Sequence, residues 1–195
     1  MKIVIDGNIG CGKTTVIKRL NDDLRIPIFL EPLHKWDKLL SLFYEEPSKW
    51  AFPFNLEVMT GFNDWKRNSF PAIYERSPLS CRNVFTELNY ESGHIHPLEL
   101  KIFDKIYNEL SWMPDMVIYI QTDPTVCASR MQERGRDCEK GVGLDYIKKV
   151  HDKYEKMVKL PQSLQITPIV DGNKDKDEVF ETVKALVEKA LAGHH

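Results

Sequence analysis

Residues 2–15, KIVIDGNIGCGKTT, constrain the fold more than any other stretch of the chain. Ile3, Val4 and Ile5 form a short apolar run, typical of a parallel strand that is covered on both faces. The pattern GxxxxGK[ST] follows, in which glycines let backbone N–H groups turn inward around an anion, and the next helix adds its partial positive charge. The strand, loop and helix together predict a nucleoside triphosphate site.

Each residue of this phosphate loop is a candidate ligand contact. Lys13 is expected to reach the outer phosphates, and the hydroxyl of Thr14 to ligate Mg²⁺. The predicted nucleotide-binding set is Gly7, Asn8, Ile9, Gly10, Cys11, Gly12, Lys13, Thr14 and Thr15.

The rest of the chain alternates apolar strand-like runs with helical periodicity. Strands are predicted at 3–5, 26–30, 72–74, 116–120 and 166–170. Helices are predicted at 14–24, 33–44, 54–68, 80–90, 97–112, 124–134, 144–159 and about 179–191, with a turn-rich connector at 45–53. Alternation of this kind favours an α/β fold of the P-loop type, a five-stranded parallel sheet in three layers.

Length, charge and cysteine usage narrow the class of protein. The 195 residues fit a single domain, at 1–192, and residues 193–195 resemble the remnant of a tag. A net charge of -2 gives no basic face for nucleic acid, so we expect a small-molecule ligand. No apolar run could span a membrane, and four scattered cysteines indicate a reduced chain. With no targeting segment before the first strand, we expect a cytoplasmic protein.

Three functions fit a phosphate loop: a GTP-dependent switch, a nucleoside monophosphate kinase and a nucleoside kinase. A switch reads guanine with NKxD, but Asn173, Lys174 and Asp175 are followed by Lys176. The other two functions are separated by the residues that follow the second and third predicted strands. These are Glu31 with Pro32, and Glu75 with Arg76.

Several motifs in a fixed order resemble the deoxyribonucleoside kinase family over residues 2–158. They are GNIGCGKTT at 7–15, Glu31-Pro32, Trp36, YEEPSKWAFPFN at 44–55, ERS at 75–77 and RMQERGR at 130–136. A thymidylate kinase would be expected to have aspartate-arginine where this chain has Glu75 and Arg76.

The resemblance implies transfer of the γ-phosphate of ATP to the 5′-hydroxyl of a deoxynucleoside. Glu31 matches the general base, Glu75 joins Thr14 on Mg²⁺, and Arg76 lies near the 5′-oxygen. The glycine-flanked segment 135–143 matches a lid, and the arginines leading into it are expected to bind the transferring phosphoryl group. These are Arg130, Arg134 and Arg136.

The acceptor pocket is also implied by the resemblance. Tyr44 and Glu139 are assigned to the 3′-hydroxyl, Trp36 and Phe85 to the two faces of the base, and Asn55 to the base edge. The family has glutamine at this last position, one methylene longer than asparagine. The other pocket positions are Phe54, Val58, Phe62 and Cys81.

The apolar wall predicts the preferred substrate. Phe62 and Cys81 replace the charged pair of members that favour deoxycytidine and purines, so we expect thymidine first and deoxycytidine second. The resemblance also implies a homodimer through the helices predicted at 54–68 and 97–112.

Overall fold

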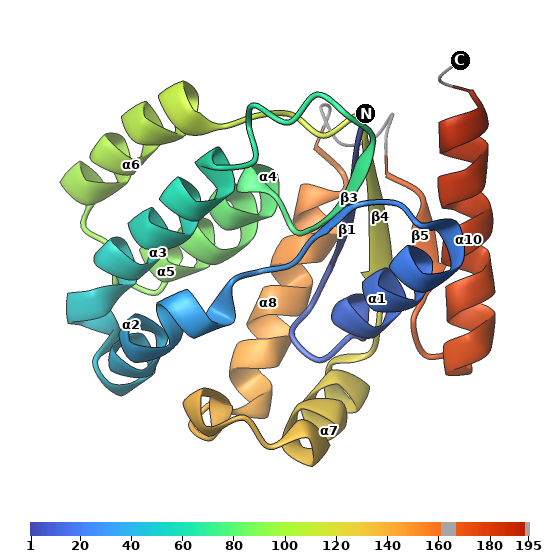
Figure 1. The fold of residues 1–195 in the computed structure, drawn as a ribbon. Coiled ribbons are helices and arrows are strands. Elements are labelled where there is room, and N and C mark those ends of the chain that lie inside the picture. Colours follow the sequence, from blue (N-terminus) through green and yellow to red (C-terminus); the bar gives the residue numbers. More distant parts are fainter. Residues whose placement is uncertain (161–166, 194–195) are drawn as a thin grey trace.

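The sheet has five parallel strands in the order β2-β3-β1-β4-β5 (Figure 1). The computed structural model describes residues 1–160 and 167–193. The strands are β1 (Lys2–Gly7), β2 (Ile28–Phe29), β3 (Ala72–Glu75), β4 (Met116–Gln121) and β5 (Ile169–Asp171). The predicted α/β fold with a five-stranded parallel sheet is confirmed.

Helices connect the strands and cover the sheet. They are α1 (Lys13–Leu24), α2 (Leu33–Glu45), α3 (Pro47–Asn63), α4 (Pro78–Ser80), α5 (Glu87–Glu91), α6 (Pro97–Leu110), α7 (Pro124–Arg134), α8 (Leu144–Met157) and α10 (Lys176–Ala192). A π-helix, η1 (Cys81–Thr86), joins α4 to α5, and a short 3₁₀ helix, η2 (Asp137–Glu139), follows α7. None of the helices at 1–160 and 167–193 is long and apolar enough to cross a membrane.

Alternate residues of β1 face the two helical layers. Ile3 and Ile5 pack among residues of α1, α7 and α10, whereas Val4 packs among residues of η1, α5 and α8. All three are fully buried, as the apolar run predicted for a strand between two layers. Figure 1 shows α1 and α10 on one side of the sheet and α8 on the other.

The strand order brings three chain segments together at one edge of the sheet. β3 pairs with both β1 and β2, and Ile5 lies beside Glu75 in the register of β1 and β3. The phosphate loop after β1, Glu31 after β2 and Arg76 after β3 therefore meet at the carboxyl ends of their strands. Ligands of open α/β sheets bind at this edge.

Two predicted boundaries were wrong, and parts of two predicted segments lie outside the described residues. The expected connector at 45–53 is mostly helical, because α3 already starts at Pro47 and ends at Asn63. A proline fits the first helical turn, where its missing N–H costs nothing, although Pro53 lies inside the same helix. The fifth strand starts later than predicted, and Ile166 lies outside the described residues, as do His194 and His195.

The helix predicted at 80–90 is interrupted. η1 occupies its centre, and the backbone N–H of Glu87 donates to the carbonyl of Arg82, five residues earlier. Wide turns of this kind occur mostly as single insertions in α-helices, frequently at functional sites.

Candidate active site

A cavity of about 500 Å³ lies at the carboxyl ends of the central strands. Its lining includes the phosphate loop, the ends of β2 and β3, and side chains from α2, α3, η1, α7 and α8. Every residue predicted to bind the acceptor is among them: Glu31, Trp36, Tyr44, Phe54, Asn55, Val58, Phe62, Arg76, Cys81, Phe85 and Glu139. The cavity is also lined by most of the predicted nucleotide-binding residues, by Glu75 and by the three predicted arginines: Ile9, Gly10, Gly12, Lys13, Thr14, Thr15, Glu75, Arg130, Arg134 and Arg136.

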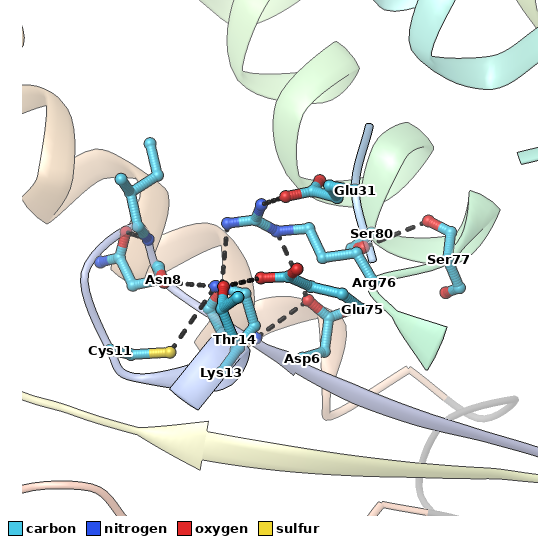
Figure 2. Close-up of polar contacts among 12 residues, drawn as sticks. Asp6, Asn8, Cys11, Lys13, Thr14, Glu31, Glu75, Arg76, Ser77 and Ser80 are labelled. Carbon is cyan, nitrogen blue, oxygen red and sulfur yellow. Dashed lines mark hydrogen bonds and ion pairs between the residues drawn. The ribbon is translucent and has the colours of Figure 1, made fainter. Parts of the chain in front are cut away.

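The phosphate loop is held in shape by bonds from its own side chains. The Nζ of Lys13 donates to the carbonyls of Gly7 (3.0 Å) and Asn8 (2.7 Å) (Figure 2). The Nδ2 of Asn8 in turn donates to the carbonyl of Ile147 on α8 at 2.9 Å. Gly7, Asn8 and Cys11, which are not among the cavity-lining residues, thus belong to the frame of the loop.

Gly10 packs too closely against α7 for any other residue. Its φ is 80°, and a Cβ there would lie 2.3 Å from the carbonyl oxygen of Cys127. Glycine alone combines this left-handed backbone with such a close approach.

Thr14 and Glu75, the two predicted Mg²⁺ ligands, meet beside the loop. The hydroxyl of Thr14, at the start of α1, donates to Oε1 of Glu75 at 2.6 Å (Figure 2). Mg²⁺ prefers oxygen ligands and retains several waters when it binds beside phosphates, so one hydroxyl and one carboxylate fit it. Within the described residues, no group of three or more His, Cys, Asp or Glu side chains forms an alternative metal site.

Glu31 and Arg76 form a buried ion pair. The Nη1 of Arg76 donates to Oε2 of Glu31, its Nη2 donates to the carbonyl of Gly7 at 3.3 Å, and its guanidinium lies 4.9 Å from the ring centre of Phe85. Arg76 has a φ of 63°, uncommon for a residue with a side chain. Burial raises the pKa of Glu31, while Arg76 opposes that rise.

Asp6 and Tyr154 contact the guanidinium of Arg76 in the interior of the protein. The hydroxyl of Tyr154, on α8, accepts from Nε of Arg76 at 3.1 Å and donates to Oδ1 of Asp6 at 2.6 Å. Both side chains are fully buried. Neither residue was predicted, because Asp6 lies between the strand predicted at 3–5 and the motif at 7–15, and Tyr154 has the apolar helical spacing of a core position.

The arginines near the lid make protein contacts. Arg134 donates to both carboxylate oxygens of Glu139 (2.7 and 2.6 Å), and Arg136 donates to one of them at 3.3 Å. Arg130 donates to the carbonyls of Cys11 (3.4 Å) and Gly172 (3.2 Å). The segment 135–143, which was predicted to be a lid, contains η2, and Glu139 of η2 lines the cavity.

Aromatic rings enclose the other part of the cavity. Trp36 and Phe62 meet edge to face at 6.3 Å, and Tyr44 meets Tyr146 in the same way at 6.2 Å. Burial raises the pKa of Cys81 to about 12, so its thiol remains protonated. Four lining residues were not predicted, because their helical spacing is that of core positions: Leu33, Leu40, Phe43 and Tyr146.

The amide of Asn55 has two protein partners. Its Nδ2 donates to the carbonyl of Ala51 at 2.7 Å, and its Oδ1 accepts from the hydroxyl of Thr86 at 3.0 Å. Thr86 is fully buried and is not among the cavity-lining residues. Nothing in the sequence alone distinguished it from other helical threonines.

Comparisons with known proteins agree with the fold and identify the family. The family model described as deoxynucleoside kinase matches residues 3–192. A probable deoxycytidine kinase of Fowlpox virus (strain NVSL) is 34% identical, covering 93% of this chain and 82% of its own length. The thymidine kinase of Ictalurid herpesvirus 1 (strain Auburn) is 30% identical, with coverages of 92% and 82%.

A solved structure has the same fold. The deoxyadenosine kinase from M. mycoides, determined with dCMP and dCDP bound, superposes with a TM-score of 0.88 over 97% of this chain and 100% of that chain, at 24% identity. The family match, together with relatives of at least 30% identity along most of the chain, shows that this chain belongs to the deoxynucleoside kinase family, whose members are phosphotransferases.

Proposed function

We propose that the chain transfers the γ-phosphate of ATP to the 5′-hydroxyl of a pyrimidine deoxynucleoside, with thymidine as the best substrate and deoxycytidine second. The observation that carries this proposal is one cavity that contains the phosphate loop, the Glu31–Arg76 pair and an aromatic pocket. The thymidine and deoxycytidine kinases among its relatives support a pyrimidine acceptor.

ATP is the phosphoryl donor in this proposal. The loop's backbone N–H groups and Lys13 bind its phosphates, and Lys13 exchanges its contacts with the loop carbonyls for phosphate oxygens. Thr14 and Glu75 would hold Mg²⁺, which neutralises phosphate charge when bound.

Glu31 accepts the proton of the 5′-hydroxyl. The hydroxyl oxygen forms a bond to the γ-phosphorus while the bond from that phosphorus to the bridging oxygen of ADP breaks, and the hydroxyl proton passes to the carboxylate. Arg76 holds this carboxylate in place, and its fixed positive charge opposes the rise in the pKa of Glu31 that burial causes. Arg130, Arg134 and Arg136 stabilise the charge on the transferring group, as guanidinium groups suit phosphoryl oxygens.

Trp36 and Phe85 enclose the base, and Asn55 binds its edge. Val58, Phe62 and Cys81 form an apolar wall that admits the thymine methyl group, and the buried ring of Phe62 leaves little room for a purine. Tyr44 and Glu139 bind the 3′-hydroxyl, with Phe54 packed on Phe43 beside them, at 5.3 Å between ring centres.

The test is a panel of four deoxynucleosides and thymidine monophosphate, each assayed with ATP and Mg²⁺. Thymidine is expected to give the highest kcat/KM and deoxycytidine the second. A preference for deoxyguanosine or deoxyadenosine would overturn the pocket argument. Faster phosphorylation of thymidine monophosphate than of thymidine would favour the alternative, a thymidylate-type kinase.

We further propose that residues 1–192 act as one kinase domain in the cytoplasm, and as a homodimer through α3 and α6. Leu98 and Ile102 of α6 are 61% and 49% exposed, an unusual exposure for two large apolar side chains one helical turn apart. Light scattering is expected to give twice the monomer mass of 22.7 kDa. A monomer at assay concentrations would refute this assembly.

A further inference from the structure

We propose that Thr86 is a positioning residue for base recognition: its hydroxyl restrains the amide of Asn55 in the orientation that the carbonyl of Ala51 selects, and through this amide the enzyme binds the base edge. This inference rests on the proposed function, because it concerns how the acceptor nucleoside is bound. Thr86 itself is not among the cavity-lining residues, whereas Asn55 is, so Thr86 acts through Asn55.

The orientation of the amide follows from hydrogen-bond chemistry. The carbonyl of Ala51 can only accept, so the Asn55 atom that lies 2.7 Å from it must be the nitrogen. Oδ1 therefore points towards Thr86, whose hydroxyl must donate to it at 3.0 Å. A flipped amide would place its oxygen against the Ala51 oxygen and lose that bond, although the Thr86 hydroxyl could then accept from the amide nitrogen. The carbonyl of Ala51 therefore selects the orientation, and the bond to Thr86 restrains the amide in it.

The π-helix explains why Thr86 can reach Asn55. In an α-helix of 3.6 residues per turn, side chains five positions apart point about 140° away from each other. In η1, hydrogen bonds join residues five apart, so Cys81 and Thr86 lie on the same side of the helix. Both contact Asn55, Cys81 through a thiol 3.8 Å from its backbone carbonyl and Thr86 through its hydroxyl.

The two hydrogen bonds to Ala51 and Thr86 leave one donor and one acceptor site of the Asn55 amide available for a ligand. Nδ2 has one remaining N–H, and Oδ1 has one remaining lone pair. A pyrimidine base offers a neighbouring donor and acceptor on the edge that includes N3, which matches this pair. Fixing the amide lets the shorter asparagine bind such an edge without a loss of side-chain freedom on binding.

The first experiment replaces Thr86 with valine, which keeps the side-chain shape and removes the hydroxyl. We expect KM for thymidine to rise about three- to tenfold, the effect of one neutral hydrogen bond. kcat and KM for ATP should change by less than about twofold, because the chemistry and the ATP site are untouched. Thr86→Ser, which retains the hydroxyl, should restore the wild-type KM.

Thr122→Val is the matched control. Thr122 is also buried, and its hydroxyl has no hydrogen-bond partner among the described residues. The substitution removes the same group at a similar depth, so KM for thymidine should remain at the wild-type value. An equal rise in both valine variants would indicate a general effect of the substitution and would overturn the proposal.

A double-mutant cycle tests whether Thr86 acts through Asn55. In an Asn55→Ala background, Thr86→Val should have no further effect on thymidine binding, measured by calorimetry. An effect of unchanged size in that background would overturn the inference, as would a wild-type KM in Thr86→Val alone. Failure of the proposed function is distinguishable, since the wild-type enzyme would then prefer a purine deoxynucleoside or thymidine monophosphate, or phosphorylate nothing in the panel.

Discussion

The substitution Glu31→Gln separates the charge and proton acceptance of this side chain from its size and hydrogen bonding. Glutamine has nearly the same size, and its carbonyl oxygen can still accept the hydrogen bond from Nη1 of Arg76. The shape of the cavity and the position of Arg76 should therefore persist. What disappears is the negative charge and the capacity to take a proton.

The magnitude of the effect follows from the surroundings of the carboxylate. The Glu31 side chain is only 9% exposed, and burial raises its pKa, which makes it a stronger proton acceptor than a free glutamate. Loss of a positioned general base costs about 10²- to 10⁴-fold in kcat. This corresponds to about 2.7–5.4 kcal/mol of transition-state stabilisation. KM for thymidine should remain within about threefold, because the base pocket is intact.

The assay measures ADP release with saturating ATP and Mg²⁺ over a range of thymidine concentrations, and calorimetry gives thymidine affinity separately. Glu87→Gln is the control, since Glu87 also accepts from an arginine, Nη1 of Arg82 at 2.6 Å, and is not among the cavity-lining residues. A kcat within about tenfold of wild type would refute the role of Glu31 as base. A loss of thymidine binding with unchanged kcat would instead assign Glu31 to substrate binding.

Three further perturbations test other parts of the site. Because Glu31 must be ionised to accept a proton and its pKa is raised, kcat/KM should fall as pH drops through a value above 4.5, the ordinary glutamate pKa. An inflection at or below that value in a pH–rate profile would contradict the assignment. Thr14→Ala removes one oxygen beside Glu75, so half-maximal activity should require at least about tenfold more Mg²⁺ in a titration; an unchanged requirement would exclude Thr14 as a ligand. Gly10→Ala places a Cβ 2.3 Å from the Cys127 oxygen at a φ of 80°, so unfolding free energy should fall by about 2–4 kcal/mol. Denaturant unfolding measures this loss of stability. A wild-type midpoint would show that the phosphate loop shifts to accommodate the Cβ.

The sheet and the residues that line the cavity could be predicted because both follow from the order of strands and motifs along the chain. The carboxyl ends of parallel strands lie side by side, so Glu31, which follows β2, and Glu75, which ends β3, had to lie near the loop after β1. The acceptor pocket was predicted from motifs, and the same residues line one cavity in the structure.

The remaining features depend on packing between segments that are distant in sequence. Asp6 and Tyr154 meet only because α8 packs on β1, and their separation of 148 residues hides the contact in the sequence. The π-helix depends on a local insertion that helical periodicity does not reveal. The proline-rich start of α3 resembles a loop in sequence, but in the structure it is helical and packs with α2 around Leu40, Phe43 and Ala51.

Arg76 limits how this enzyme can be stabilised by design. Its left-handed backbone costs about 1–2 kcal/mol, which glycine would recover. Removing the guanidinium, however, would leave Glu31 and Asp6 without their shared counter-charge in the interior, at a cost of about 3–5 kcal/mol. Thermostabilising substitutions must therefore be sought away from this strand end, where activity and folding both require the guanidinium of Arg76.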